Sequence, residues 1–579
     1  MTKRTITAIA ALVTALLSFS ACSGDNSTSS IDAVSQPEAT TAPTTQTSAS
    51  TNASTTVTTT TSATTSATTT TTAPETEEPP VIEEYCGELL SFVATTPNGT
   101  KLKYKIDEED STVYCDATYN ANYASPYELK FASVTAEAEN GTCIFGDTET
   151  TAKLDLSDKQ TFVVEDINGQ TKEYTVITEQ THGLLPIINI TLADDKDVDD
   201  IKRNKTTEMT ISIDCTNAPE YSHGLSMASG TIRGRGNSTW KWDKKPYKIK
   251  LDEKAEVLGL PANKDWILLA NYADKSLMRC TLAYSMGKVM DNFDWVPTQY
   301  PVDLFINGEY QGVYSIGEHM ETGKNRVNIT EQSEESAECG YLLEVGGADS
   351  DYTTKGVDYF HADSDLLNFI TFNYPSPKNI TDEQKEHIMS WVQGADDAIV
   401  AKEGLEEYID IDSFCDWIII QELTNNTDSA FRRSCFLTKD VGGLLKMGPI
   451  WDFDLSFGNL VVDNSHYDSW TIIGSYDEDA YVQASWGNFL MKNESFRARL
   501  RERWFEVRDE LLQTAMDTID YYGEKIYPSQ VENFQVWDIW DIKAGYSSWS
   551  NYKANTYELQ LQYLKDFLND RADWIDENI

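Results

Sequence analysis

Two carboxylates stand two residues apart in the stretch GPIWDFDLSFGN, residues 448–459. In a β-strand, residues i and i+2 share a face, so Asp452 and Asp454 would point together, away from the apolar residues around them. Like charges on one face repel each other unless a cation lies between them. Mg²⁺, held by one or two carboxylates and a substrate phosphate, would supply that cation. A turn at a sheet edge, with one solvated Asp and one N-cap, is the alternative that the residues leave open.

A second charged group lies in RGRGNSTWKWDKKPYKIKL, residues 233–251, which has seven basic residues and one acidic residue. If PYKIKL is a strand, Lys248 and Lys250 share one face, and Arg233 and Arg235 alternate with glycines in the same fashion. Such a face, edged by glycines that let a ligand approach the backbone, is a candidate polyphosphate cradle. A solvated strand face paired with nearby acids explains the same pattern.

The third group is ELTNNTDSAFRRS, residues 422–434, in which Asn426 and Asp428 follow an apolar helical run. A strand–hairpin–strand between Asp428 and Asp452 would bring these two aspartates together. Phosphoryl transfer to a hydroxyl needs a carboxylate that orients the nucleophile, Asp or Asn on Mg²⁺, and Lys or Arg on the phosphates. Helix capping is the structural alternative for Asn and Asp at this place.

The elements that would position these groups are mostly strands first and helices later. Strand patterns occupy 207–214, 230–236, 246–251, 300–307, 311–318 and 341–346, and helical spacing occupies 383–401 and 411–425. The last hundred residues are helical and rich in aromatic residues. This order predicts an α+β, two-lobed domain over residues 184–579, with a cleft between the lobes.

Residues 81–183 have a different character, with short β-prone runs separated by turn signals. The dipeptides Asn98-Gly99, Asn140-Gly141 and Asn168-Gly169 are typical of hairpins. The pattern predicts one all-β sandwich, Ig-like in general style. A spacer or a binding module is the expected role, because this region holds no catalytic constellation.

The beginning of the chain indicates export. Residues 1–22 have a basic start, an apolar core and small residues before Cys22, so we expect a lipoprotein signal with Cys22 as the lipidated residue. An ordinary cleavable signal is the alternative. Residues 23–80 are mainly Thr, Ser and Ala and cannot bury enough apolar surface to fold, which predicts a disordered tether. The folded part is therefore expected on the extracellular face of a bacterial cell membrane, bound to it only through the lipid.

Composition excludes several classes of function. The chain has 46 basic and 93 acidic residues, a net charge of −47, so nucleic acid is not an expected partner. The six His residues show no H-x-x-x-H spacing, and neither C-x-x-C nor G-x-S-x-G occurs. Zinc hydrolases and serine hydrolases with a nucleophile elbow therefore have no support.

Four motifs in order resemble the CotH family, the spore-coat-type atypical protein kinases and their secreted bacterial relatives. These motifs are RGRGNSTW…KKPYKIKL, NYADKSLMR, VDLFINGEYQGVYSIGEHME and NTDSAFRRSCFLTKDVGGLLKMGPIWDFDLSFGN. The resemblance implies a divergent kinase-like fold that transfers phosphate from ATP to Ser or Thr with Mg²⁺ or Mn²⁺. By position, Asp428 matches the catalytic-loop Asp and Asp452 the metal-holding Asp, with Asp454 as an accessory ligand and Asn426 as a weaker one.

The nucleotide contacts are less defined by the resemblance. We expect Arg233, Arg235, Lys248 and Lys250 to bind the nucleotide, with Glu318 as the ion-pair partner that orients one of the lysines. The G-x-G-x-x-G-x-V, V-A-I-K and H-R-D motifs of ordinary kinases do not occur, so nucleotide placement cannot be copied from them.

The prediction is a secreted, membrane-anchored Ser/Thr kinase that modifies surface proteins, among them its own Thr-rich tether. The competing hypothesis is a non-catalytic binding or structural protein at the cell surface that keeps a kinase-like fold.

Overall fold

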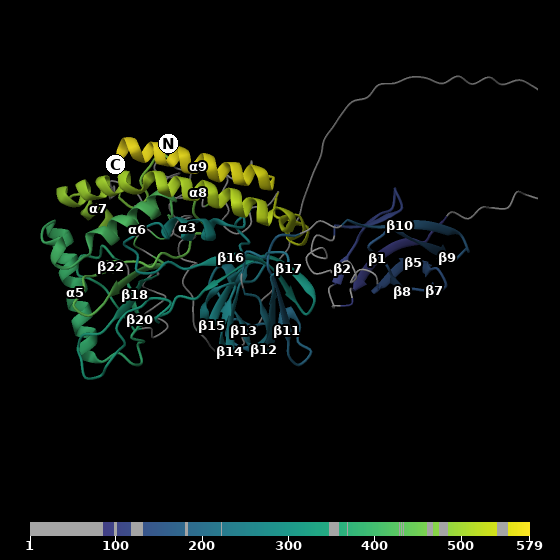
Figure 1. Cartoon of the computed structure of the whole chain (residues 1–579), viewed down its shortest axis with the longest axis horizontal. Coiled ribbons are helices and arrows are strands. Elements are labelled where there is room, and N and C mark those ends of the chain that lie inside the picture. Colours follow the sequence, from purple (N-terminus) through teal and green to yellow (C-terminus); the bar gives the residue numbers. More distant parts are fainter. Residues whose placement is uncertain are drawn as a thin grey trace, which may run out of the picture. The chain divides into compact units, whose positions relative to one another are not determined.

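The computed structural model describes residues 85–95, 97, 101–116, 131–179, 183–221, 223–346, 358–367, 369–427, 429, 431, 433–459, 467–473, 485–540 and 554–579. In these ranges the protein is a mixed α+β structure in which strands come first and helices predominate later (Figure 1). No helix within them is both long and apolar enough to cross a membrane. The signal and tether predicted for residues 1–80, including Cys22, lie outside the described residues.

The N-terminal region is all-β, as predicted. Its strands are β1 (Glu88–Thr95), β2 (Lys101–Lys103), β3 (Lys105–Asp107), β4 (Thr112–Asp116), β5 (Ala132–Glu139), β6 (Gly141–Phe145), β7 (Thr148–Glu149), β8 (Thr151–Leu154), β9 (Gln160–Asp166) and β10 (Thr171–Glu179). They form a sheet in the order β2-β1-β5-β8 and another in the order β3-β4-β10-β9-β6-β7. Buried aromatic rings, such as Phe92 and Phe162 with centroids 5.4 Å apart, connect strands of both sheets.

The turn predictions for this region have mixed outcomes. Asn168-Gly169 joins the antiparallel pair β9 and β10, so that hairpin is confirmed. Asn140-Gly141 connects β5 to β6, which belong to different sheets, so the hairpin predicted there is wrong. The backbone still turns sharply, with φ of 52° at Asn140, and the chain uses the turn to cross between sheets. Gly99 lies outside the described residues.

Seven strands then close into a barrel. They are β11 (Ile187–Leu192), β12 (Thr207–Asp214), β13 (Leu225–Gly234), β14 (Tyr247–Val257), β15 (Leu260–Leu269), β16 (Gln299–Ile306) and β17 (Glu309–Glu318), in the order β11-β12-β13-β14-β15-β17-β16. Neighbouring strands are antiparallel except at the closure, where β11 pairs with β16 in parallel. Both expected strands with basic residues, β13 and β14, are adjacent in this barrel.

The barrel interior is filled by alternate residues of its strands. Ile249 on β14, Trp266 on β15 and Tyr314 on β17 are almost completely buried there. On β14, Lys248 and Lys250 alternate with the buried residues Tyr247, Ile249 and Leu251 and point outward, as strand periodicity requires. The barrel is therefore a packed core, and a ligand site must lie on its outside.

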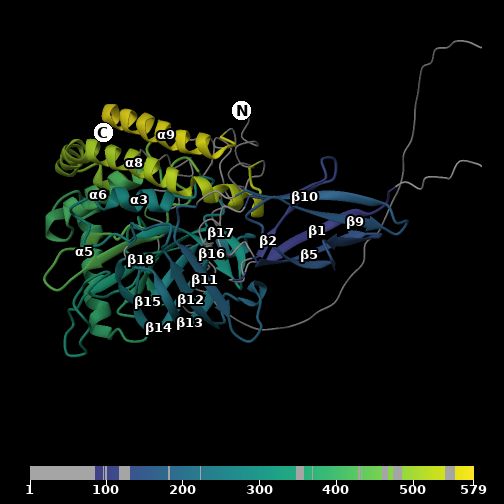
Figure 2. The same cartoon turned by 45° about the vertical axis from the view of Figure 1, so that its right-hand side comes forward.

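A second sheet and the helices complete the chain. The strands are β18 (Tyr341–Val345), β19 (Tyr359–Phe360), β20 (Ile370–Tyr374), β21 (Cys435–Lys439) and β22 (Lys446–Met447), in the order β19-β20-β18-β21-β22. The helices are α3 (Arg279–Gly287), α5 (Asp382–Ala401), α6 (Ile411–Leu423), α7 (Trp486–Leu490), α8 (Glu494–Val536) and α9 (Tyr557–Asn578). Helix α8 packs against α9, α6, α3 and β17, so it joins the barrel to the helices (Figures 1 and 2).

Candidate active site

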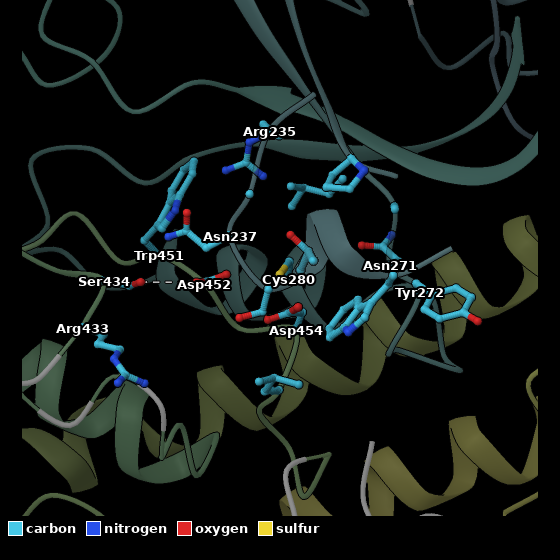
Figure 3. A pocket seen from close by; sticks show the side chains of 18 of the residues that line it. Arg235, Asn237, Asn271, Tyr272, Cys280, Arg433, Ser434, Trp451, Asp452 and Asp454 are labelled. Atoms are coloured by element: carbon cyan, nitrogen blue, oxygen red, sulfur yellow. Dashed lines mark hydrogen bonds between the residues drawn. The ribbon is translucent and has the colours of Figure 1, made fainter. Parts of the chain in front are cut away.

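A cavity of about 290 Å³ is lined by segments that are distant in sequence. The barrel contributes residues 235–239 between β13 and β14, and residues 269–272 at the end of β15. The other walls include Cys280 on α3, Glu344 on β18, residues 433–434 before β21, and the residues Trp451, Asp452, Asp454 and Leu455. Figure 3 labels Cys280, Arg433, Ser434, Trp451, Asp452 and Asp454 among them. The basic segment and the acidic stretch that stood out in the sequence therefore meet at one cavity.

The acidic stretch, residues 448–459, is a loop and not the strand that was expected; we call it the acidic loop. The last strand before it, β22, ends at Met447, and Asp452 has a left-handed backbone with φ of 67°. Both Asp452 and Asp454 nevertheless line the cavity, and so does Trp451, which strand periodicity would have placed on the opposite face. Strand alternation therefore does not describe this stretch, although both carboxylates do face the same cavity.

Side chains from other elements hold Asp452 in its unusual conformation. Its N–H donates to Tyr284 Oη on α3 over 3.4 Å, and its carbonyl accepts from Asn426 Nδ2 over 3.1 Å. Its carboxylate Oδ2 accepts a hydrogen bond from Ser434 Oγ over 3.2 Å. These bonds replace the ladder bonds that a strand would have made, which is why the chain can leave β geometry here.

Arg235 faces the two carboxylates across the cavity (Figure 3). Burial lowers the pKa of Arg235, while Asp452 and Asp454 act in the opposite direction. A guanidinium stays charged in proteins, so this half-buried side chain is a cation with incomplete solvation. Its side chain makes no hydrogen bond or ion pair with the residues that the structure describes, so its fork of donors is open to a planar or tetrahedral anion.

A third carboxylate reaches the cavity from β18. Burial raises the pKa of Glu344, and the charge of Asp452 raises it further, although Asn373 Nδ2 donates to Glu344 Oε2 over 3.2 Å. The cavity therefore combines several acids with the cation of Arg235. This is the charge pattern that a polyanion and a metal cation would complete together.

A buried ion pair supports the acidic loop from α3. Asp274 accepts from the backbone N–H groups of Ser276 and Arg279 over 2.9 and 2.8 Å, just before and at the start of α3. The Arg279 guanidinium pairs with Asp274 and donates through Nε to Ser456 O over 3.2 Å. Because both partners are almost fully buried, this contact fixes the loop rigidly against the helix.

The other basic residues predicted to bind nucleotide are placed differently from Arg235. Arg233 donates to the carbonyls of Arg203 and Gly234 over 3.3 and 3.2 Å, on the outside of the barrel. Lys248 pairs with Asp265 over 2.8 Å, and Lys250 is exposed. None of these three side chains lines the cavity, so their nucleotide role stays a prediction.

The ion pair expected between Glu318 and one of these lysines is wrong. Glu318 is buried, pairs with Arg326, and accepts from the N–H of Thr298 over 2.9 Å. Lys248 is instead 3.1 Å from His319 Nε2, and burial, together with the charges of Lys248 and Arg235, lowers the pKa of His319 to about 4. The residue chosen as the partner of the two lysines is thus already paired with an arginine.

The glycines of the basic segment have an internal packing role. A Cβ at Gly234 would lie 2.3 Å from the Trp240 ring, and one at Gly236, where φ is +82°, would lie 2.0 Å from Thr239 Oγ1. These glycines let the turn fold onto its own side chains, which places Arg235 between them. Packing within the turn explains these glycines without the close approach of a ligand to the backbone that the sequence suggested.

The residues fit a divalent ion shared with a nucleotide, although they do not form a metal site alone. Among the described residues, no group of three or more His, Cys, Asp or Glu side chains could hold a metal ion. Asp452 and Asp454 line the cavity as two oxygen donors, whereas Asn426 does not line it, although its Oδ1 is a buried oxygen without a hydrogen-bond partner among the described residues. Mg²⁺ is commonly held by one or two carboxylates, with phosphate oxygens and water as the other ligands. Asp428 lies outside the described residues, so its expected position near Asp452 is not tested.

Two residues of the site were missed by the sequence argument. Ser434 is the last residue of ELTNNTDSAFRRS, in which only the charged and amide side chains were considered, and a neutral hydroxyl does not stand out in such a pattern. Glu344 stood alone in the apolar strand YLLEV, and a single acid among buried positions was a signal that could have been used.

One comparison with known proteins assigns a family to the part of the chain that forms this cavity. The sequence model of a family described as "CotH kinase protein" matches residues 232–575, which is more than half of the 579 residues. No curated protein matches the chain. A crystal structure of a protein from Bacteroides fragilis matches at 14% identity and a TM-score of 0.13, covering 16% of this chain and 95% of the other, and this likeness carries no argument.

Proposed function

Because the chain belongs to the CotH family, whose description is that of a kinase, we propose that it is a metal-dependent protein kinase acting on Ser or Thr. The observation that carries the proposal is the open guanidinium of Arg235 opposite Asp452 and Asp454 in one cavity. A cation for phosphate and two carboxylates for a metal are what phosphoryl transfer requires. The barrel and the helical region would then act as the two lobes of a divergent kinase-like fold.

In this proposal each residue has a defined task. Arg235 binds phosphate oxygens, and Asp452, Asp454 and Asn426 Oδ1 hold Mg²⁺ or Mn²⁺. When bound, the divalent ion supplies positive charge that neutralises the phosphates. Ser434 Oγ fixes one oxygen of Asp452, and Asp428 accepts the proton of the acceptor hydroxyl.

The proposed reaction balances without a further reactant. The bond between the γ-phosphorus and the β,γ-bridging oxygen of ATP breaks, and a new bond forms between that phosphorus and the acceptor oxygen. The hydroxyl proton leaves to the carboxylate base, and ADP leaves with the electron pair of the broken bond.

The acceptor and the location are also part of the proposal. A lipid anchor at Cys22 and a tether over residues 23–80 would place many Thr and Ser hydroxyls near neighbouring copies on one membrane. High effective concentration on a surface then favours transfer between molecules. Mass spectrometry after incubation with Mg-ATP or Mn-ATP would locate phosphate in residues 40–80, and phosphate confined to the folded region would contradict it.

The activity test uses the full chain, ATP labelled on the γ-phosphate, Mg²⁺ or Mn²⁺, and a generic protein acceptor. Label should enter protein with the wild type and not with Asp428→Asn, while Asp252→Asn, an exposed change on β14, should retain activity. Equal label in wild type and Asp428→Asn would refute the base role of Asp428, and label in neither protein would refute enzymatic transfer. Binding of Mg-ATP without any transfer would favour the non-catalytic surface protein instead.

A further inference from the structure

Arg571 on α9 is buried against the end of α6, far along the chain from the cavity. Its Nε donates to Glu422 O and its Nη2 to Glu422 Oε2, both over 2.8 Å. Its Nη1 donates to the carbonyls of Tyr467 and Ser469. All three guanidinium nitrogens are therefore used, and neither Arg571 nor Glu422 is more than 2% exposed.

The Glu422 carboxylate also collects three successive backbone donors. Thr471 N donates to Oε2 over 2.9 Å, and Ile472 N and Ile473 N donate to Oε1 over 2.6 and 2.9 Å. Trp470 and Trp574 lie on the guanidinium of Arg571, with centroids 5.9 and 5.0 Å from its carbon. Glu422 and Arg571 thus bind segment 467–473 to α6 and α9.

The residues that follow Glu422 hold the acidic loop. Phe457 N donates to Thr424 O over 2.6 Å, and Asn426 Nδ2 donates to Asp452 O over 3.1 Å. Between them, Asn425 Oδ1 accepts from Thr471 Oγ1 over 2.8 Å. The turn after α6 is therefore bonded to the acidic loop on one side and to segment 467–473 on the other.

Stability alone is a poor explanation for this arrangement. Burying two charges costs desolvation, and well-packed apolar side chains of similar volume often stabilise a core as well or better. The ion pair adds geometric specificity, because its charge-assisted hydrogen bonds fix the relative orientation of the groups that form them. The hydrogen bonds of the turn after α6 extend this fixed orientation to Asn426 and to the backbone of Asp452, the residues assigned to the metal.

We propose that Glu422 and Arg571 are positioning residues for the metal end of the cavity. This inference rests on the proposed kinase function, and it predicts that both residues set metal affinity without touching metal, nucleotide or acceptor. Loss of either partner releases the turn after α6, and Asn426 and Asp452 lose their common orientation.

The test compares Arg571→Met and Glu422→Gln with Arg508→Met in the full chain. Arg508 forms an α8–α9 ion pair that is less buried, with Nε 2.8 Å from Asp576 Oδ1, and it does not line the cavity. Mn²⁺ binding in the presence of ATP is measured by electron paramagnetic resonance, and metal-free ATP binding by calorimetry. Both site variants should weaken Mn²⁺ binding at least tenfold and leave metal-free ATP binding within twofold, because Arg235 is untouched.

Additional variants separate the arrangement from simple loss of fold. Arg571→Lys keeps the charge but offers one nitrogen for four acceptors, so it should recover only part of the Mn²⁺ affinity. Glu422→Gln is isosteric, so it remains informative if Arg571→Met does not fold. Unchanged Mn²⁺ affinity in a folded Glu422→Gln protein would overturn the inference.

A separate measurement distinguishes this failure from failure of the kinase proposal. Hydrogen exchange of the amides in residues 452–457 does not depend on any ligand. If the wild type binds no Mn-ATP, the proposed function fails. In that case, faster exchange in Glu422→Gln than in Arg508→Met still supports the positioning role, and equal exchange refutes it.

Discussion

Asp452 combines a functional carboxylate with a backbone conformation that most side chains avoid. Its φ of 67° lies in the left-handed region, which Asn and Asp enter more readily than other non-glycine residues. A replacement by Ala would therefore change both the charge and the backbone preference. Asn is the better probe, because it keeps the size and the conformational tolerance and removes only the charge.

We expect Asp452→Asn to weaken Mg-ATP binding at least tenfold, which is about 1.4 kcal/mol, because one of two metal carboxylates is lost. Its unfolding midpoint should stay close to that of the wild type, since Asp452 is exposed. Calorimetry and thermal unfolding measure the two quantities, with Asp252→Asn as the control. An unchanged Mg-ATP affinity would sink the metal assignment.

Arg235 is predicted to serve ligand binding at the expense of stability. Its side chain is half-buried at the cavity and makes no hydrogen bond to the described residues, so Arg235→Met should unfold at the same or a higher temperature. The same change should weaken ATP binding at least tenfold, with or without metal. Arg235→Lys should restore little, because a point charge cannot form the fork of contacts. A variant that loses stability and keeps ATP affinity would contradict this assignment.

At the level of single residues, the sequence predicts types better than contacts. Strand alternation correctly separated Lys248 from Ile249, which the structure places on opposite faces of β14. It could not choose Arg235 over Arg233, because the difference depends on the turn after β13. Glu318 was assigned to the wrong partner for the same reason: register brings strands together, but side-chain direction selects Arg326.

The turn between β13 and β14 depends on a glycine next to Arg235. At Gly236, φ is +82° and an added Cβ would meet Thr239 Oγ1 at 2.0 Å. Gly236→Ala should therefore cost about 1–2 kcal/mol of stability and also weaken ATP binding. Gly442→Ala is the matched control, because φ there is +67° and nothing lies within 4 Å. Equal effects of both changes on ATP affinity would show that the turn does not place Arg235.

The seam between β16 and α8 holds a carboxyl group that makes stability depend on pH. Burial raises the pKa of Asp303 to about 7, against the opposing hydrogen bonds of Ser529 and Tyr310 and the charge of Lys244. The folded protein thus keeps this proton over a range, from about pH 4 to 7, in which the unfolded chain has lost it. The stability from Asp303 is present below that range and is lost as pH rises through it.

Asp303→Asn tests this pH dependence. Urea unfolding at pH 5 and pH 8 should show that the wild type loses more free energy of unfolding than the variant, by an amount on the order of 1–4 kcal/mol. Parallel pH profiles would contradict the raised pKa.

At the level of elements, local patterns predicted most strands and the helices α5 and α6. The closed barrel was not predicted, because its closure pairs β11 with β16, and periodicity carries no information about partners so distant in sequence. The acidic loop was read as a strand for a related reason. Alternation of apolar residues is compatible with a strand but does not require one, and here the backbone bonds from Tyr284 and Asn426 hold a loop instead.

For the whole molecule, net charge opposes the proposed ligand. At −47 the protein repels ATP at long range, and the Debye length of about 10 Å at 0.1 M salt limits that repulsion. The association rate of ATP should therefore increase with ionic strength between about 0.01 and 0.1 M. Stopped-flow fluorescence would measure it, with uncharged adenosine as the control. A rate that decreases with salt would mean that the local field of Arg235 dominates.

The partnership between Glu422 and Arg571 also has a consequence in time. A ribosome makes Glu422 first and must add 149 more residues before Arg571 exists. At about 5–20 residues per second this delay lasts roughly 7–30 s. Until then Glu422 in the nascent chain lacks its arginine partner, and the turn after α6 lacks the contacts that hold it. With the positioning role proposed for this pair, we expect that a chain that ends before Arg571 does not orient Asn426 and Asp452 and does not bind Mn²⁺.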